Sequence, residues 1–186
     1  MTRSLPVYRP ELQFSDAALC GDCGGNCCKR LPGSTHPEEW GATDDDKIAN
    51  LTDALATGTW EIDWWEGDPR TDSLQFDGDI ECTNGYFVRP GIVGFDVRTL
   101  GLRHAAWGGK PCKFLQPTGC ELRHDMRPVE CRGLEPMPPE VRKARGCGTD
   151  ATLNTNKQSN AVAWMPFHHV IFEAERRALE MLRGGK

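Results

Sequence analysis

Residues 20–28 read CGDCGGNCC, so four cysteines fall within nine positions. Cys20 and Cys23 have the Cys-x2-Cys spacing, in which a tight turn brings two sulfurs close enough to share one metal ion. The glycines and the asparagine between the cysteines are typical of turns in which some residues have positive φ. Because four thiols set among glycines and polar residues do not make a core, this stretch predicts a metal-binding turn around which the chain is organised.

The adjacent pair Cys27-Cys28 is a less common arrangement of ligands. Neighbouring side chains point in different directions on a strand or a helix. Both sulfurs therefore face one metal only if the backbone forms an irregular turn. In the alternative, one of the two binds this metal and the other serves a second metal or the core.

A second set of cysteines follows far downstream. Cys112 and Cys120 flank a Pro-Thr-Gly turn that predicts a short hairpin, and Cys131 lies between Arg127-Pro128 and Arg132. Distance along the chain is no obstacle, because folding joins remote ligands. The predicted metal ligands are Cys20, Cys23, Cys27, Cys28, Cys112, Cys120, Cys131 and Cys147. The role of Cys82 stays open between a further ligand and a small buried hydrophobe.

The alternative use of cysteines, a disulfide framework, fits this chain poorly. There are nine cysteines, an odd number. The first residues contain no apolar run of a signal peptide, and no segment approaches the roughly 20 apolar residues of a membrane span. We therefore expect a cytoplasmic protein with reduced thiols and no membrane contact. The net charge of −5 is spread along the chain and makes no broad basic face, so we expect no nucleic-acid partner.

The donor set narrows the kind of metal. Ligation by thiolates alone suits an iron–sulfur cluster, which we prefer, as well as zinc, and eight cysteines allow two sites. His124, four residues after Cys120, is the histidine best placed to replace a thiolate. Glycine-rich dinucleotide motifs, phosphate loops and Ser-His-Asp motifs do not stand out. The sequence therefore identifies a binding site and leaves catalysis open.

Arg127 and Arg132 flank the predicted ligand Cys131. We assign both to cofactor binding, because guanidinium groups can donate hydrogen bonds to thiolate sulfurs or bind an anionic ligand beside the metal. The alternative is that they form surface ion pairs. The acids close enough in sequence for such pairs are Glu121, Asp125 and Glu130.

The remaining pattern predicts a small, irregular α+β domain. Its 186 residues indicate a single domain over residues 1–186, built around the cysteine-ligated metal site. The expected elements are a helix capped by Thr43 and stopped near Gly58, strands over 60–64 and 85–93, a hairpin over 112–122, a short helix from Pro138 to Gly146, and a C-terminal amphipathic helix with apolar positions Phe167, Ile171, Ala174, Ala178 and Leu182.

Two motif blocks carry a resemblance to a known family. They are Cys20-x2-Cys23-x3-Cys27-Cys28, and Cys112-x-Phe114-Leu115, Gly119-Cys120-x-Leu122 and Arg127-Pro128-x2-Cys131-Arg132. In both blocks the chain resembles the cysteine-cluster family of CxxCxxxCC type, which is described as carrying a zinc- or iron-chelating domain. The resemblance covers residues 20–132, with 41–80 as an insertion, and 36–39 resembles the acidic segment that follows the first cluster.

The expected function is binding of a metal through cysteine thiolates. Relatives in the cysteine-cluster family include the flagellin lysine N-methylases, so the resemblance also implies an alternative, a metal-dependent, methyltransferase-like enzyme that modifies a protein side chain. A third reading is a structural zinc adaptor. Both alternatives imply a protein substrate or partner. Whether the protein is an enzyme stays open, because no acid–base pair converges with the cysteines in sequence.

Overall fold

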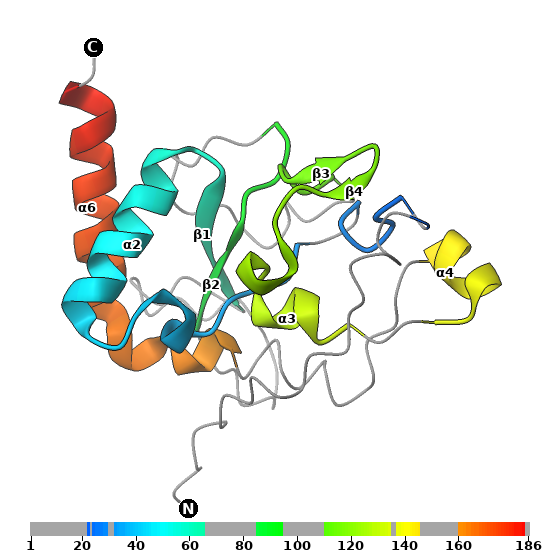
Figure 1. Ribbon diagram of the computed structural model, residues 1–186. Helices are drawn as coiled ribbons and strands as arrows, with labels where there is room; N and C mark the ends of the chain where they lie inside the picture. The colour runs from blue at the N-terminus through cyan, green and yellow to red at the C-terminus, as the bar shows by residue number, and fades with distance from the viewer. Residues whose placement is uncertain are drawn as a thin grey trace, which may run out of the picture.

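The computed structural model describes residues 22, 24–29, 32–65, 85–94, 110–134, 137–145 and 160–184. In this part of the chain, helices combine with short antiparallel strands, as expected for a small α+β protein (Figure 1). The predicted ligands Cys20, Cys23 and Cys147 lie outside the described residues, as do Cys82, whose role the sequence leaves open, and Gly146.

Helix α2 (Asp44–Ala56) confirms the predicted capped helix. The Thr43 side chain accepts a hydrogen bond from the backbone N–H of Asp46, and the Asp46 carboxylate accepts one from the Thr43 N–H. This reciprocal capping box satisfies two N–H groups that the first turn leaves without helical partners. The helix ends before Gly58, whose φ of 73° favours glycine.

Strands β1 (Trp60–Trp65) and β2 (Gly85–Pro90) form an antiparallel pair. The register runs from Trp60 opposite Pro90 to Trp65 opposite Gly85. The sequence predicts both strands, the first from its alternating residues and the second within 85–93 with an end at Pro90, where β2 ends. Every residue of β2 is buried, so this strand is covered on both faces.

The charged residues of β1 are buried as well. Glu61 and Asp63 are 1% and 0% exposed, and both contact the buried Arg89 of β2, whose Nη2 lies 2.9 Å from a carboxylate oxygen of each. Glu61 is directly opposite Arg89 in the register. The alternation of apolar and charged residues in β1 therefore predicts a strand correctly. It does not mark one face of the strand as buried and the other as exposed to solvent, because the charged residues are buried too.

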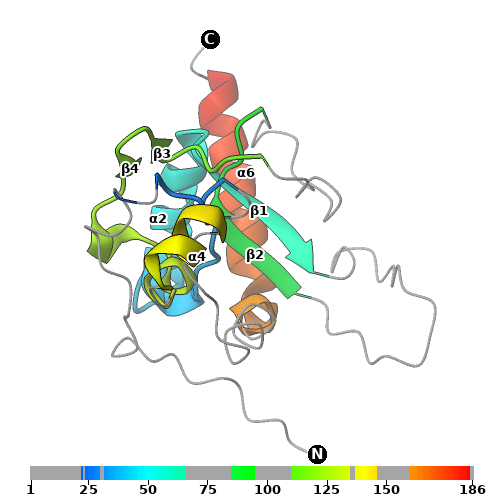
Figure 2. The same cartoon turned by 90° about the vertical axis from the view of Figure 1, so that its right-hand side faces the viewer.

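Helix α6 (His168–Gly184) follows the short 3-10 helix η5 (Met165–Phe167) and packs along α2 (Figures 1 and 2). The predicted apolar stripe is confirmed at Ile171, Ala174 and Ala178, which are buried. Glu173 and Arg177, four positions apart on the exposed side of α6, form an ion pair at 2.7 Å. The core shared by the two helices and the sheet contains Ile48, Leu51, Leu55, Ile62, Tyr86, Val88, Trp164, Val170, Ile171 and Ala174.

The segment predicted as an insertion, 41–80, supplies α2 and β1 to this core. The remaining elements lie mainly on the other side of the β1–β2 sheet in Figure 1. They are β3 (Leu115–Gln116), β4 (Gly119–Cys120), η4 (His124–Met126), α3 (Val129–Arg132) and α4 (Pro139–Arg145). The 3-10 helix η1 (Pro37–Trp40) precedes α2 in the chain. The β3–β4 pair is the predicted hairpin, and α4 is the predicted proline-opened helix.

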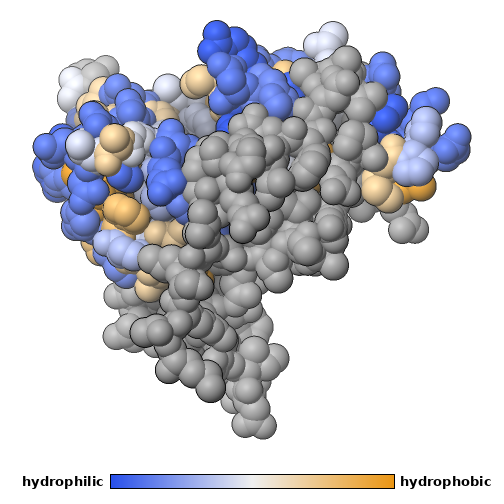
Figure 3. Space-filling view, turned by 60° about the horizontal axis from the view of Figure 1, so that its bottom comes forward, coloured by the Kyte–Doolittle hydropathy of each residue, from blue (hydrophilic) through white to orange (hydrophobic). Residues whose placement is uncertain are grey.

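On the face shown in Figure 3, hydrophilic residues dominate and hydrophobic ones form small areas. The large hydrophobic side chains that are exposed are Val93, Met126, Phe172 and Met181. Among the helices of the described part, none is long and apolar enough to cross a bilayer.

Candidate metal centre

The turn over residues 24–29 presents Cys27 and Cys28. Gly24 and Gly25 have φ of 60° and 66°, as the glycine-rich sequence predicted, and the turn is closed by a 3.2 Å hydrogen bond from the Lys29 N–H to the Gly25 carbonyl. A Cβ on Gly25 would overlap the side chain of Leu115 in β3. Glycine therefore serves twice here, because it permits the turn and lets the turn approach the hairpin.

A backbone hydrogen bond joins the two predicted cysteine blocks. The N–H of Cys112 donates to the carbonyl of Cys28 at 2.8 Å. Cys112 also forms an isolated antiparallel bridge with Ile92, just beyond β2, and only 4% of it is exposed. The first cysteine turn is thus attached to the segment that leads into the β3–β4 hairpin.

Cys131 approaches the same region from α3. Its Sγ accepts a 3.3 Å hydrogen bond from the N–H of Gly33, and a Cβ on Gly33 would lie 2.7 Å from that sulfur. The neighbouring Glu130 carboxylate accepts hydrogen bonds from the N–H and Oγ of Ser34, at 2.7 and 2.8 Å. The segment that follows the first cysteine turn is therefore held against α3.

The thiols of the three segments influence one another's ionisation. The pKa of Cys28 is raised by its hydrogen bond with Cys27, then by burial, and further by the negative charges of Cys27, Cys131 and Cys112. Burial raises the pKa of Cys131 well above its usual value, and the charges of Glu130, Cys112 and Cys27 add to this effect. These four sulfurs are therefore close enough to repel one another as thiolates.

Cys120 extends the group through the hairpin. Burial raises the pKa of Cys112 to about 11, and the negative charges of Cys120 and Glu61 act in the same direction. Cys120 lies in β4 opposite Leu115. Five of the eight predicted ligands thus form no disulfide and lie in one region, namely Cys27, Cys28, Cys112, Cys120 and Cys131.

This crowding fits a cation in chemical terms. Buried thiols that raise one another's pKa stay protonated by themselves, and a metal ion reverses the balance because its charge compensates several thiolates. Within the described residues, no three Cys, His, Asp or Glu side chains converge on a position that would hold a metal ion. Three predicted ligands, Cys20, Cys23 and Cys147, lie beyond the described ranges.

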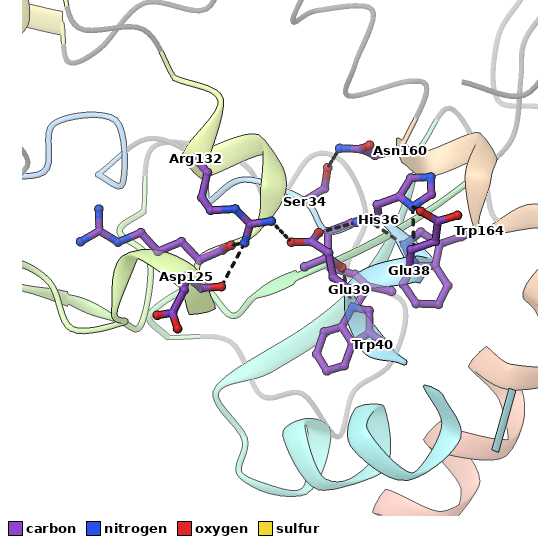
Figure 4. A network of polar contacts seen from close by, with 12 residues as sticks. Ser34, His36, Glu38, Glu39, Trp40, Asp125, Arg132, Asn160 and Trp164 are labelled. Atoms are coloured by element: carbon purple, nitrogen blue, oxygen red, sulfur yellow. Dashed lines mark hydrogen bonds and ion pairs between the residues drawn. The ribbon is translucent and has the colours of Figure 1, made fainter. Parts of the chain in front are cut away.

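Arg132 is held by an acid that the sequence did not suggest. It is 5% exposed, and its Nη2 donates to Oε1 of Glu39 in η1 at 2.8 Å (Figure 4). Its Nη1 donates to the backbone carbonyls of Asp125 and Arg127. Arg127 is also buried, and its Nε donates to the carbonyl of Leu122 at 3.1 Å. Both arginines therefore brace the backbone around η4 and α3.

Glu39 is fixed on its other side by a capping box. Its Oε2 accepts the N–H of His36 at 2.7 Å, while the His36 side chain accepts the N–H of Glu38. Through Glu39, the acidic segment 36–39 thus links η1 to Arg132 of α3. His124, the predicted substitute ligand, is the first residue of η4.

Sequence reasoning missed three residues that shape this region: Gly33, Glu39 and Glu130. Each acts through a partner about 90 or more positions away, so no local pattern marks it. The one available signal was the resemblance of the acidic segment 36–39 to the family segment after the first cluster.

The interpretation of this site rests on the chemistry of its own residues. No family model, curated protein or solved structure matches this chain.

Proposed function

We propose that this protein binds a metal through cysteine thiolates, as the cysteine-cluster family that it resembles is described to do. The observation that supports this most is the gathering of thiols from three separate segments. The Cys28 carbonyl accepts a backbone hydrogen bond from Cys112. The negative charges of Cys27, Cys131 and Cys112 help to raise the pKa of the Cys28 thiol. A cysteine that serves only as a small buried hydrophobe does not require other thiols beside it.

The way in which the thiols are brought together also supports binding. Two glycines, Gly25 and Gly33, allow close approach where any Cβ would overlap Leu115 or Cys131. Without these approaches the first cysteine turn would lie further from the hairpin, and Gly33 would lie further from α3. Without a metal these thiols would stay protonated, and a cation would allow several of them to bind it as thiolates.

An iron–sulfur cluster is the metal group that we prefer, with zinc as the alternative. The ligands would come from Cys20, Cys23, Cys27, Cys28, Cys112, Cys120, Cys131 and Cys147. Thiolate ligation suits both groups, and the number of cysteines allows two sites. A bound cluster would supply electron transfer, whereas zinc, whose d shell is full, would not, and a zinc ion closed by four thiolates would have a structural role.

Arg132 supports the site as a positioning residue in this proposal. It follows Cys131 directly on α3, and its buried ion pair with Glu39 and its bonds to two carbonyls hold that short helix in place. Outer residues of this kind orient metal ligands and are costly to remove. Arg132 would then act through Cys131 rather than by contact with the cofactor.

The test is anaerobic purification of the full chain followed by metal and acid-labile sulfide analysis. We expect stoichiometric iron and sulfide, or stoichiometric zinc without sulfide. Replacing Cys28 or Cys131 by Ser should lower the metal content severalfold. Met181→Ser is the control, because Met181 is an exposed residue of α6 and no cysteine is changed, and it should keep the metal. Absence of metal after reconstitution with iron and sulfide and with zinc would refute the proposal, as would unchanged metal content in both ligand variants.

A further inference from the structure

A cavity of about 540 Å³ lies beside the candidate metal centre and shares no cysteine with it. It is bounded by η1, α2 and the start of β1 on one side and by η4 and α3 on the other. Its volume falls in the range of small-molecule sites, roughly 300–1,000 Å³. Neither the cysteine pattern nor the proposed metal binding accounts for it.

Apolar groups make up most of its wall. The indoles of Trp40 and Trp60 meet edge to face, with ring centroids 5.1 Å apart, and the ring of Phe114 supports Trp60 at 5.8 Å. Ala54, Met126 and Pro128 complete the apolar lining. The wall is pre-formed, because the Trp40 Nε1 donates to Oγ1 of Thr35 at 2.8 Å and so fixes the indole.

Hydrogen-bond acceptors dominate the polar end of the cavity. The Glu39 carboxylate already accepts hydrogen bonds from Arg132 and from the backbone N–H groups of His36 and Val129, and a carboxylate has about four acceptor positions. The Arg132 guanidinium is turned to Glu39 and to the carbonyls of Asp125 and Arg127 (Figure 4). The side-chain amide of Asn50 donates to the carbonyl of Trp40, which leaves its own carbonyl as an acceptor.

The charges that line the cavity favour a cation. They are the two carboxylates of Glu39 and Asp125 and the single guanidinium of Arg132, so the lining carries one net negative charge. Asp125 also pairs with Arg123, but both side chains are about two-thirds or more exposed, so solvent screens that pair. Burial raises the pKa of Glu39, and a nearby ligand cation would oppose that effect.

We propose that this cavity binds a small organic cation that carries a flat ring, with the ring against Trp40 and Trp60 and the cationic group toward Glu39 and Asp125. Indole rings attract cations through their negative faces, and the largely buried carboxylate of Glu39 and the exposed carboxylate of Asp125 add to that preference. An anionic ligand would be repelled by the hydrogen-bond acceptors of the cavity. The Arg132 guanidinium would compensate it poorly, because it already donates to three oxygen atoms. No predicted cysteine ligand lines this cavity, and Arg132 is the residue that it shares with the metal proposal.

Calorimetric titration of the full chain with benzamidine, benzamide and benzoate tests the proposal. The three probes share one ring and differ in charge. We expect saturable binding of benzamidine, binding of neutral benzamide on the order of tenfold weaker, and still weaker binding of benzoate. No saturable binding of benzamidine, or benzoate that binds as tightly as benzamidine, would overturn it.

Variants locate the binding site. Asp125→Asn should weaken benzamidine severalfold and leave benzamide unchanged, whereas Trp60→Leu should weaken both probes. Asp45→Asn is the matched control, because Asp45 is an exposed acid of α2 outside the cavity, and it should leave both affinities unchanged. Equal effects of Asp125→Asn and Asp45→Asn, or full affinity in folded Trp60→Leu, would overturn the assignment. The substitutions avoid the Glu39–Arg132 pair, whose loss threatens folding.

Discussion

Replacing Gly33 by Ala tests whether close contact between residues 33–34 and α3 builds the cysteine site. The added Cβ would lie 2.7 Å from Sγ of Cys131, 2.8 Å from its backbone nitrogen and 3.0 Å from Cβ of Glu130. Two of these distances are shorter than real Cβ contacts. A backbone nitrogen does not yield as the end of a flexible side chain does, and the Ser34–Glu130 hydrogen bonds hold the two segments together. Overpacking of this kind costs about 1–3 kcal/mol.

A second effect partly offsets this cost. Exchanging Gly for Ala restricts the unfolded chain and stabilises by about 0.4–1 kcal/mol where the fold tolerates the methyl group. The hydrogen bond from the Gly33 N–H to Cys131 would also lengthen, at a cost of about 1 kcal/mol. We therefore expect a net loss of about 1–3 kcal/mol, together with a lower metal content because Cys131 moves.

Urea denaturation of the protein as purified measures the free energy of unfolding, and metal analysis of the same samples measures the site. Gly184→Ala is the control, because no atom lies within 4 Å of the position where its Cβ would be. This control should be as stable as the parent chain or slightly more stable. The reasoning is refuted if Gly33→Ala matches the control in both stability and metal content.

Three further predictions concern the rest of the fold. Arg89→Met should destabilise the protein by about 3–5 kcal/mol in urea denaturation, because it leaves Glu61 and Asp63 buried without their shared cation; a loss under about 1 kcal/mol would contradict the buried triad. Burial lowers the pKa of His36, so the unfolded chain binds more protons and stability should fall as the pH drops below about 6.5; His36→Asn, which still caps η1, should flatten this part of the stability–pH curve. Thr43→Ala should cost about 1 kcal/mol by removing the capping box of α2, and an unchanged urea midpoint would show that this cap is dispensable.

Local sequence determined the helices and strands of the described part. Thr43 and the acids after it begin α2, the alternating residues 60–64 form β1, and the turn between Cys112 and Cys120 forms the hairpin. These signals are readable because capping, strand period and turn chemistry act between residues only a few positions apart. The abundance and spacing of the cysteines likewise predicted a thiol-rich turn with positive φ at Gly24 and Gly25.

Only the tertiary structure decided how charged residues and thiols are distributed. Glu61 and Asp63 alternate with apolar residues as surface residues do, yet both are buried, because Arg89 on the neighbouring strand compensates them. The sequence offers Arg132 three acids close by, yet its ion pair is with Glu39, on a helix far away in the chain.

The same holds for the candidate metal centre. The sequence by itself determined which residues carry thiols and predicted that they serve a metal, but nothing in their spacing says that the Cys28 carbonyl accepts from Cys112 or that Gly33 lies under Cys131. Such contacts arise when α2, α6 and the β1–β2 sheet form a core and the remaining segments pack beside it. Local patterns act over a turn or a strand pair, whereas the choice among distant partners depends on burial and shape complementarity of the whole fold.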